Sequence, residues 1–372
     1  MSRSLVSGNV LVAFFTTAFC GYAPTTIAQT QELEMLCEFD RDTPPGNIAV
    51  TPDDRIFISQ HQFYNPQYRV VEVLPDCSTQ PFPSERWSLP PDERGIGLNN
   101  VLGINADKNG ILWMLDRAPG NGEAGRLVGW DTRSDTLHRI IYLAPPLIPA
   151  SHSFLNDLAI DSDRNAIYIA DTATPDKSAL LVIDLETGYV RRVLEGRESV
   201  TPEDIPIEID NGEPLVLGGR EARVGVNPIT IDADNEWVYF GPMSGRSLYR
   251  VRSRDLLDLS LSSEELESRV ERYGDRPNSD GITVDGGGNV YITDINNNAI
   301  GVVDATGEYR VLYQDDRLLS WSDGFAFGPD GFIYLTSNQL HRSPPFNQGD
   351  DRSVPPFYLL RFPSLEPGEV GR

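Results

Sequence analysis

The segment SDGITVDGGGNVYITDI, residues 279–295, decides the fold of this chain. Residues 281–285 form an apolar, β-branched run, and residues 290–293 form a second one that Asp294 closes. Between them, residues 286–289 read Gly-Gly-Gly-Asn, and these two residue types supply the positive φ angles of a tight reversal. The segment therefore predicts a β-hairpin whose glycines serve the turn and need no ligand.

The same pattern occurs six times along the chain. The paired runs are 47–50 with 55–58, 103–105 with 111–114, 158–160 with 166–169, 229–231 with 237–240, 281–285 with 290–293, and 325–327 with 332–335. Most repeats continue into a second hairpin, as in residues 179–194. Equivalent positions lie 43 to 71 residues apart when Val50, Asn105, Ile160, Ile231, Val284 and Phe327 are aligned. This period predicts an all-β protein, a six-bladed β-propeller.

A propeller of six four-stranded blades must close into a ring. The last repeat ends with a strand at 357–362 and has no strand after it, whereas residues 33–39 precede the first hairpin and have no partner of their own. We predict that this N-terminal strand becomes the outer strand of the last blade, which removes an exposed sheet edge. Residues 29–372 then form one propeller domain.

The first 28 residues have the pattern of a signal peptide. Arg3 is followed by an apolar run at 10–20 and by small residues that allow cleavage after Ala28 or Ala23. Cys20 follows the bulky Phe19, which disfavours a lipid anchor, and the apolar run is too short to span a bilayer. We expect a secreted protein, either periplasmic or extracellular, without membrane insertion.

The charge composition of the chain limits the classes of molecule that it is expected to bind. Lys plus Arg total 31 against 55 for Asp plus Glu, a formal net charge of −24, which repels nucleic acid and anionic lipid. We expect a monomer that binds a small molecule, with cationic ligands favoured. Removal of the signal peptide leaves Cys37 and Cys77, which either form a disulfide across the first repeat or stay as two separate thiols.

Two segments interrupt the regular spacing. Residues 196–225 are polar and glycine-rich, and residues 341–356 are rich in Pro, Asp and Gly. Long loops on a rigid scaffold either line a site or are neutral insertions. A short helix is predicted over 264–270, with Ser262 or Ser263 as its cap.

The later repeats resemble the major royal jelly protein/Yellow family. The resemblance is carried by residues 225–229, 238–244 and 247–251, by 279–282 with 294–300, and by 321–325 with 335–340. It is dense from about residue 150 to 362 and thinner before. It implies a secreted six-bladed propeller with a ligand pocket at one mouth of the central channel. Some members bind small amines, some bind lipids or proteins, and some insect members are associated with dopachrome tautomerisation. More distantly, the chain is similar to calcium-dependent lactonases of the gluconolactonase/regucalcin type.

In a propeller, the starts of the inner strands and the ends of the second strands emerge on one face. Four residues before the aligned positions stand Gly46, Val101, Asn156, Asn227, Asp280 and Asp323; the second strands end near His61, Asp116–Arg117, Asp171, Pro242, Asp294 and Asn338. Four adjacent blades thus present amides or carboxylates at one mouth. The candidate ligand-binding residues are Asn156, Asn227, Asp280, Asp323, His61, Arg117, Trp321 and Asn338.

The resemblance to the lactonases also implies a calcium site. Asn227 and Asp280 match two of the metal ligands of that family, and Asn156 matches a further pocket asparagine. The glutamate of the first repeat is absent, because Gly46-Asn47 stands in its place; Asp323 could substitute for it. Ca²⁺ is therefore a possible cofactor held by Asn227 and Asp280. Alternatively, Asn and Asp at these positions only cap turns, as Asp116, Asp171 and Asp294 could.

Three functions follow. The leading hypothesis is a secreted royal jelly/Yellow-like propeller that binds a small organic ligand at its channel mouth. The alternative is a metal-dependent lactonase or a dopachrome-tautomerase-like isomerase, and a third is a scaffold for another protein. The sequence has no nucleophile elbow, HExxH, CxxC or phosphate loop, so whether the protein is an enzyme stays open.

Overall fold

The computed structural model describes residues 1, 32–117, 124–149, 152–209 and 212–372. The predicted signal peptide, apart from Met1, lies outside these residues. Residues Glu32–Arg372 form one compact unit. None of the helices in the described part is both long enough and apolar enough to span a bilayer.

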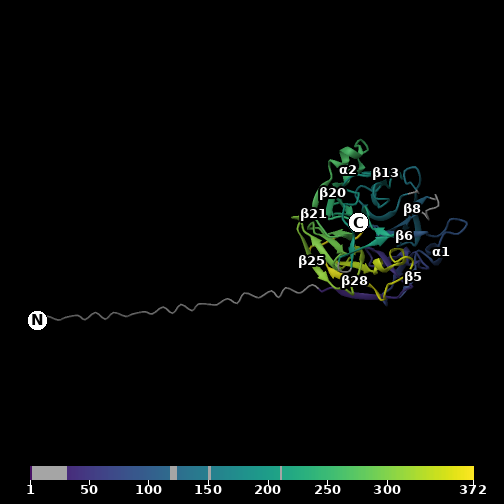
Figure 1. Ribbon diagram of the computed structural model, residues 1–372, viewed down its shortest axis with the longest axis horizontal. Helices are drawn as coiled ribbons and strands as arrows, with labels where there is room; N and C mark the ends of the chain where they lie inside the picture. The colour runs from purple at the N-terminus through teal and green to yellow at the C-terminus, as the bar shows by residue number, and fades with distance from the viewer. Residues whose placement is uncertain (2–31, 118–123, 150–151, 210–211) are drawn as a thin grey trace. The chain divides into compact units, whose positions relative to one another are not determined.

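The unit is a six-bladed β-propeller, as the repeats predict. Six four-stranded antiparallel sheets follow one another around a centre, from β5 and β8 through β13 and β20 to β25 and β28 in Figure 1. The inner strands are β2 (Pro45–Val50), β6 (Asn100–Ala106), β10 (Leu155–Asp161), β18 (Val226–Ile231), β22 (Ser279–Val284) and β26 (Ser322–Phe327). The second strands are β3 (Ile56–Gln60), β7 (Ile111–Arg117), β11 (Ala166–Asp171), β19 (Trp237–Pro242), β23 (Val290–Asp294) and β27 (Phe332–Ser337).

The two outer strands of each blade vary more in length than the inner strands do. The third strands are β4 (Val70–Val73), β8 (Gly125–Asp131), β12 (Ala179–Asp184), β20 (Ser247–Arg252), β24 (Ala299–Val303) and β28 (Phe357–Pro363). The outermost strands are β5 (Thr79–Pro81), β9 (Thr136–Leu143), β13 (Val190–Val193), β21 (Glu271–Asp275), β25 (Tyr309–Gln314) and β1 (Glu34–Phe39).

Short elements lie in the loops within and between the blades. The long insertion folds into two small hairpins, β14 (Glu208–Ile209) with β15 (Glu213–Pro214) and β16 (Val216–Leu217) with β17 (Arg220–Glu221). The helices are α1 (Glu85–Ser88), α2 (Ser253–Leu257) and α3 (Ser263–Glu267), and the 3-10 turns are η1 (Gln62–Tyr64), η2 (Leu340–Arg342) and η3 (Pro344–Phe346). The predicted helix is α3, and Ser262 caps it in a capping box with Glu265.

The N-terminal strand closes the ring, as predicted. β1 pairs antiparallel with β28 and is the outermost strand of the sixth blade. Cys37 in β1 forms a disulfide with Cys77, which lies in the turn between β4 and β5 of the first blade. Of the two alternatives for the cysteines, the structure has the disulfide. It joins the last blade to the first across the point of closure.

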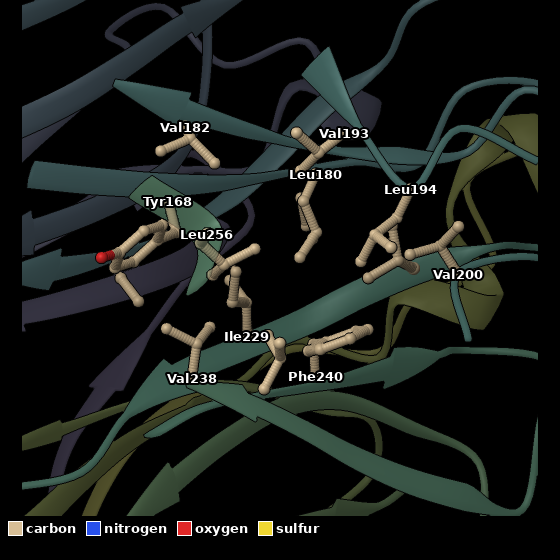
Figure 2. Packing of buried hydrophobic residues seen from close by; sticks show 14 of the residues in the cluster. Tyr168, Leu180, Val182, Val193, Leu194, Val200, Ile229, Val238, Phe240 and Leu256 are labelled. Atoms are coloured by element: carbon tan, nitrogen blue, oxygen red, sulfur yellow. The ribbon is translucent and has the colours of Figure 1, made fainter. Parts of the chain in front are cut away.

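Apolar side chains fill the spaces between adjacent blades. Between the third and fourth blades, Tyr168 and Leu180 face Val238 and Phe240, and all four are buried (Figure 2). Burying one such side chain stabilises the fold by about 1.5–3 kcal/mol. This packing makes the sheets a rigid frame for the residues at the channel.

A β-bulge interrupts every inner strand near its start, where two residues lie opposite one residue of the second strand. A bulge bends the strand and redirects its side chains. The paired bulge residues are Gly46 and Asn47, Leu102 and Gly103, Asn156 and Asp157, Asn227 and Pro228, Asp280 and Gly281, and Asp323 and Gly324.

The prediction for the second blade is wrong by one residue. Ala106 pairs with Leu112 as Val50 pairs with Ile56, so Ala106, not Asn105, is the aligned position. Leu102 therefore takes the place assigned to Val101, and the second blade presents an apolar side chain at the mouth.

Candidate functional site

A pocket of about 300 Å³ lies at the channel mouth, where the bulges of five of the six blades contribute to its lining. Its polar lining comes largely from the inner strands. Its apolar lining comes from β6, from loops that precede the inner strands or follow the second strands, from the insertion and from the η2–η3 segment. The lining residues used below are Asn47, His61, Phe154, Asn156, Leu217, Arg223, Asp280, Trp321, Asp323, Leu340 and Phe346. Four of the predicted residues therefore share this pocket with Trp321: Asn156, Asp280, Asp323 and His61.

Asp280 is held by two N–H donors. The Trp321 indole donates to its Oδ2 at 2.7 Å, and the Asn227 amide donates to its Oδ1. Asn227 is itself buried behind Asp280. Burial raises the pKa of Asp280 to about 6, while these two hydrogen bonds lower it. Asn227 and Trp321 thus favour the ionised form of a carboxyl group whose burial opposes ionisation.

Trp321 has an unusual backbone conformation. Its φ of 55° lies in the left-handed region, which a bulky residue enters at a cost of about 1–3 kcal/mol. The indole bond to Asp280 and stacking against His341, with ring centroids 5.9 Å apart, hold the side chain in place. Strained residues of this kind cluster at functional sites.

Asp323 is positioned from the neighbouring strand. Asn338 donates to its Oδ2 at 2.8 Å and, through the same nitrogen, to the Pro45 carbonyl at 2.8 Å. Asn338 is 0% exposed, so its role is to position Asp323 and not to meet a ligand. Burial raises the pKa of Asp323 well above its usual value, and the neighbouring Asp280 raises it further.

A third carboxyl group, Asp157, was not predicted. Asn47 donates to its Oδ1 at 3.1 Å, although the two residues belong to the first and third blades. Gly103 lies between them, and a Cβ there would stand 2.5 Å from the Asn156 carbonyl. Burial raises the pKa of Asp157 to about 7, with a contribution from Asp280.

Asn47 and Asp157 are the second residues of their bulges. The repeat pattern predicts one residue per blade at the channel mouth, whereas each bulge places two residues there. The available signal was glycine at this position in the second, fifth and sixth blades, which indicates close approach of another chain segment. At Gly281, for example, a Cβ would lie 2.1 Å from the Asp323 carbonyl.

His61 lines the pocket as a neutral side chain. Its Nδ1 accepts from the Phe63 N–H at 3.2 Å, which leaves the ring proton on Nε2. Burial lowers the pKa of His61 to about 3, and the positive charge of Arg117 lowers it further. His61 can therefore donate a hydrogen bond near neutral pH and is a weaker base than an exposed histidine.

Arg117 lies behind the pocket wall. Its guanidinium carbon is 4.2 Å from the ring centroid of Phe154, and its terminal nitrogen donates to Gln62 at 3.0 Å. Phe154 lines the pocket and Arg117 does not, so ligand binding by Arg117 stays a prediction.

The insertion and the late loop line the pocket. Leu217 and Arg223 come from the insertion, and Leu340 and Phe346 come from the η2–η3 segment. These two long segments therefore line the pocket and are not neutral insertions. Their individual residues were not predicted, because no repeat pattern places them.

The acidic residues that follow the second strands serve the backbone, as the alternative interpretation has it. Asp116 accepts from the Asn99 and Asn100 N–H groups and pairs with Arg126. Asp171 and Asp294 make equivalent contacts, with Phe154 N–H and Asn297 N–H respectively. None of these three lines the pocket.

The other part of the channel is nearly filled. A cavity of only about 30 Å³ lies there, lined by Asn47, Asp157 and Arg372 among others. The Arg372 guanidinium donates to the Val284 carbonyl at 2.7 Å and to the Ile231 carbonyl at 3.3 Å. Such a space holds about one water molecule.

The donor set does not fit calcium. Ca²⁺ takes six to eight oxygen ligands, whereas both oxygens of Asp280 already accept from N–H groups. The Asn47 amide is directed at Asp157. Across the described ranges, no three His, Cys, Asp or Glu side chains gather closely enough to hold a metal ion. Calcium binding by Asn227 and Asp280 stays a prediction, and these contacts weigh against it.

Proteins of known structure share this fold, but no curated protein sequence matches the chain. Solved structures of similar fold include a luciferin-regenerating enzyme (14% identity, 92% of this chain and 98% of that chain, TM-score 0.58). They also include a gluconolactonase from Xanthomonas campestris (13%, 89% and 89%, 0.54) and the calcium-binding protein regucalcin from Agrobacterium tumefaciens (13%, 92% and 98%, 0.54). At these identities the likeness is one of fold.

The family match is more specific. The family model described as Major royal jelly protein matches residues 100–345, which include the second to fifth blades, the insertion and most of the pocket. The chain therefore belongs to the major royal jelly protein family.

Proposed function

We propose that this protein binds a small organic ligand in the pocket at its channel mouth. The observation that supports the proposal most directly is the 300 Å³ pocket itself, with apolar walls and the half-buried carboxyl groups of Asp280 and Asp323. Small-molecule sites typically have about 300–1,000 Å³ and a few polar groups in an apolar lining. A volume at the lower limit favours a ligand of one or two rings.

The carboxyl groups define the polar end of the ligand. Asp280 is held toward its ionised form by Asn227 and Trp321, so it attracts a cation or a strong hydrogen-bond donor. The rings of Phe154, Trp321 and Phe346 provide an apolar surface for the rest of the molecule. A primary ammonium group on an aromatic body satisfies both requirements.

The protein is proposed to act after export, as a monomer. The disulfide between Cys37 and Cys77 supports an oxidising compartment. Export predicts that mature protein recovered from the source cells begins after Ala28 or Ala23, which N-terminal sequencing measures. A retained Met1 would contradict export.

Calorimetric titration with 2-phenylethylamine tests the binding proposal. We expect saturable binding by the intact protein, a rise in Tm, and an affinity at least about tenfold lower in Asp280→Asn, because one charge-assisted contact contributes about 1.5–3 kcal/mol. Glu308→Gln, which removes an exposed carboxylate, is the matched control. If neither amines nor sugar lactones bind, the scaffold hypothesis replaces the proposal.

The lactonase and tautomerase alternatives rest on resemblance. A calcium titration separates the lactonase from the leading proposal: we expect no heat of binding with micromolar to millimolar Ca²⁺. Saturable calcium binding that disappears in Asp280→Ala would restore the metal-dependent hydrolase.

A further inference from the structure

The pocket has a second charged side chain of opposite sign. Arg223 lines it from the segment that follows β17, whereas Asp280 and Asp323 line it from the bulges of the inner strands. The acidic residues therefore belong to the frame of the channel, and the arginine belongs to the insertion that covers its mouth. Apolar residues of the insertion, such as Leu217, and of the other loops at the mouth complete the lining.

The charge of Arg223 is only weakly compensated. Its ion pairs are with Glu221 at 3.0 Å and Asp204 at 3.9 Å, carboxylates whose side chains are 54% and 106% exposed. Exposed pairs of this kind contribute little and are screened by salt. The Arg223 side chain is 28% exposed, so a ligand anion in the pocket would meet it in a less hydrated setting than its present partners do.

A second cation, Arg117, lies close to the pocket. Arg117 stacks on Phe154, and its terminal nitrogen donates to the neutral Gln62. Its Nε is buried and has no hydrogen-bond partner among the described residues. The adjacent carboxylate, Asp116, is already paired with Arg126. The positive charge of Arg117 acts on the pocket: burial is the main cause of the lowered pKa of His61, and Arg117 lowers that pKa further.

We propose that the ligand of this pocket is a zwitterion, with a cationic group at Asp280 and Asp323 and an anionic group, carboxylate or an equivalent, at Arg223 on the other side of an apolar body. The inference rests on the proposed function and adds the anionic group to it. In a protein with a net charge of −24, a binding site that selects an anion must supply its own cations. Arg223 is the pocket-lining residue that does so.

Two probes of matched shape test the inference at pH 7.5. 2-Phenylethylamine carries only the cation, and 4-(2-aminoethyl)benzoic acid carries the same cation with a carboxylate at the far end of the ring. Calorimetry on the full chain should show the carboxylated probe binding at least about tenfold more tightly. Arg223→Gln should remove that preference, because the carboxylate then has no pocket-lining cation to meet, and it should not weaken the binding of 2-phenylethylamine, because a like charge has been removed. Arg220→Gln, on the same hairpin but outside the pocket lining, should retain the preference.

The outcomes separate the two proposals. Equal affinities, or weaker binding of the carboxylated probe, would overturn the zwitterion and leave the amine site standing. A preference that survives in Arg223→Gln would also overturn the assignment of the anion to Arg223. If neither probe binds, the proposed function fails and the inference fails with it. An unchanged Tm of Arg223→Gln without ligand shows that the variant is folded.

Discussion

At the scale of single residues, the pocket is built around one carboxyl group with two fixed donors. Asp280 cannot turn away from the channel without losing both the Trp321 indole and the Asn227 amide. The strained φ of Trp321 is maintained by the same bond. The pair is therefore mutually supporting: the tryptophan keeps the carboxyl group charged, and the carboxyl group keeps the tryptophan at the pocket wall.

Trp321→Phe tests this pairing. The substitution keeps the ring but removes the N–H donor, so the pKa of Asp280 should rise above its value of about 6. A hydrogen bond to a charged group contributes about 1.5–3 kcal/mol, so the rise should be on the order of one pH unit. Affinity for 2-phenylethylamine, measured from pH 5 to pH 8, should then be lost at a correspondingly higher pH.

The control for this variant is Trp130→Phe. Its indole donates to Asp135 at 3.0 Å in the second blade, so the same chemical change is made outside the pocket. Its pH profile should match that of the unmodified protein. Coincident profiles for Trp321→Phe and the unmodified protein would contradict a role of the indole in keeping Asp280 ionised.

Asp157 predicts a pH dependence of stability. Its folded pKa of about 7 lies above the ordinary value of 3.8, because burial favours the protonated form. The stabilisation from protonated Asp157 is therefore complete below pH 3.8 and is lost as the pH rises to about 7. Asp157→Asn, which is neutral at every pH, should gain Tm relative to the unmodified protein between pH 5 and pH 8, by a few degrees.

Thermal unfolding at a series of pH values makes this measurement. The exposed Asp316→Asn serves as control and should differ from the unmodified protein by a constant amount. A pH-independent difference for Asp157→Asn as well would mean that the Asp157 carboxyl group is not titrating in this range.

The residues of the site were predictable to the extent that they repeat. Asn156, Asp280 and Asp323 recur at one position of the hairpin pattern, and all three line the pocket. Asn47 and Asp157 were missed because a bulge adds a residue without changing the composition of the strand. Arg223 and Phe346 come from segments without periodicity, so only the folded chain places them at the pocket.

At the scale of elements, the site has a fixed part and a covering part. The bulged inner strands interlock through close contacts such as that of Gly281 with the Asp323 carbonyl. The β16–β17 hairpin, by contrast, is held by short strands and carries an exposed apolar edge, with Leu217 at 47% exposure although it lines the pocket. Substitutions in the β16–β17 hairpin should therefore lower ligand affinity more than they lower the stability of the fold.

Leu217→Ser tests that division. Loss of the apolar contact should weaken binding of 2-phenylethylamine by roughly fivefold to thirtyfold, since burying part of a leucine contributes about 1–2 kcal/mol. The Tm without ligand should stay unchanged. Val311→Ser on β25, a residue of nearly equal exposure at 46%, should alter neither quantity. A loss of Tm without loss of affinity would assign the hairpin to the fold and not to the site.

At the scale of the whole molecule, the closure of the ring was the part of the fold most open to prediction. A last blade without an outer strand and a first strand without a partner leave one solution, and β1 beside β28 is that solution. Whether Cys37 and Cys77 are bonded was left open, because a sequence does not show whether two thiols face each other across the joint between two blades.

The disulfide across this joint makes closure testable. Cys37 and Cys77 are 40 residues apart in sequence, and a cross-link over such a loop stabilises a protein by about 2–4 kcal/mol. The double variant Cys37→Ala with Cys77→Ala should unfold at a lower temperature while keeping a single cooperative transition, because β1 still pairs with β28.

Deletion of residues 32–39 removes both the strand and the bond, and it should destabilise all six blades together, since each blade relies on its neighbours for burial. Dithiothreitol separates the two contributions: it should lower the Tm of the unmodified protein to that of the double variant and leave the double variant unchanged. An unaltered Tm after the deletion would show that the ring is held by the packing between blades alone, and that closure by the N-terminal strand contributes nothing to stability.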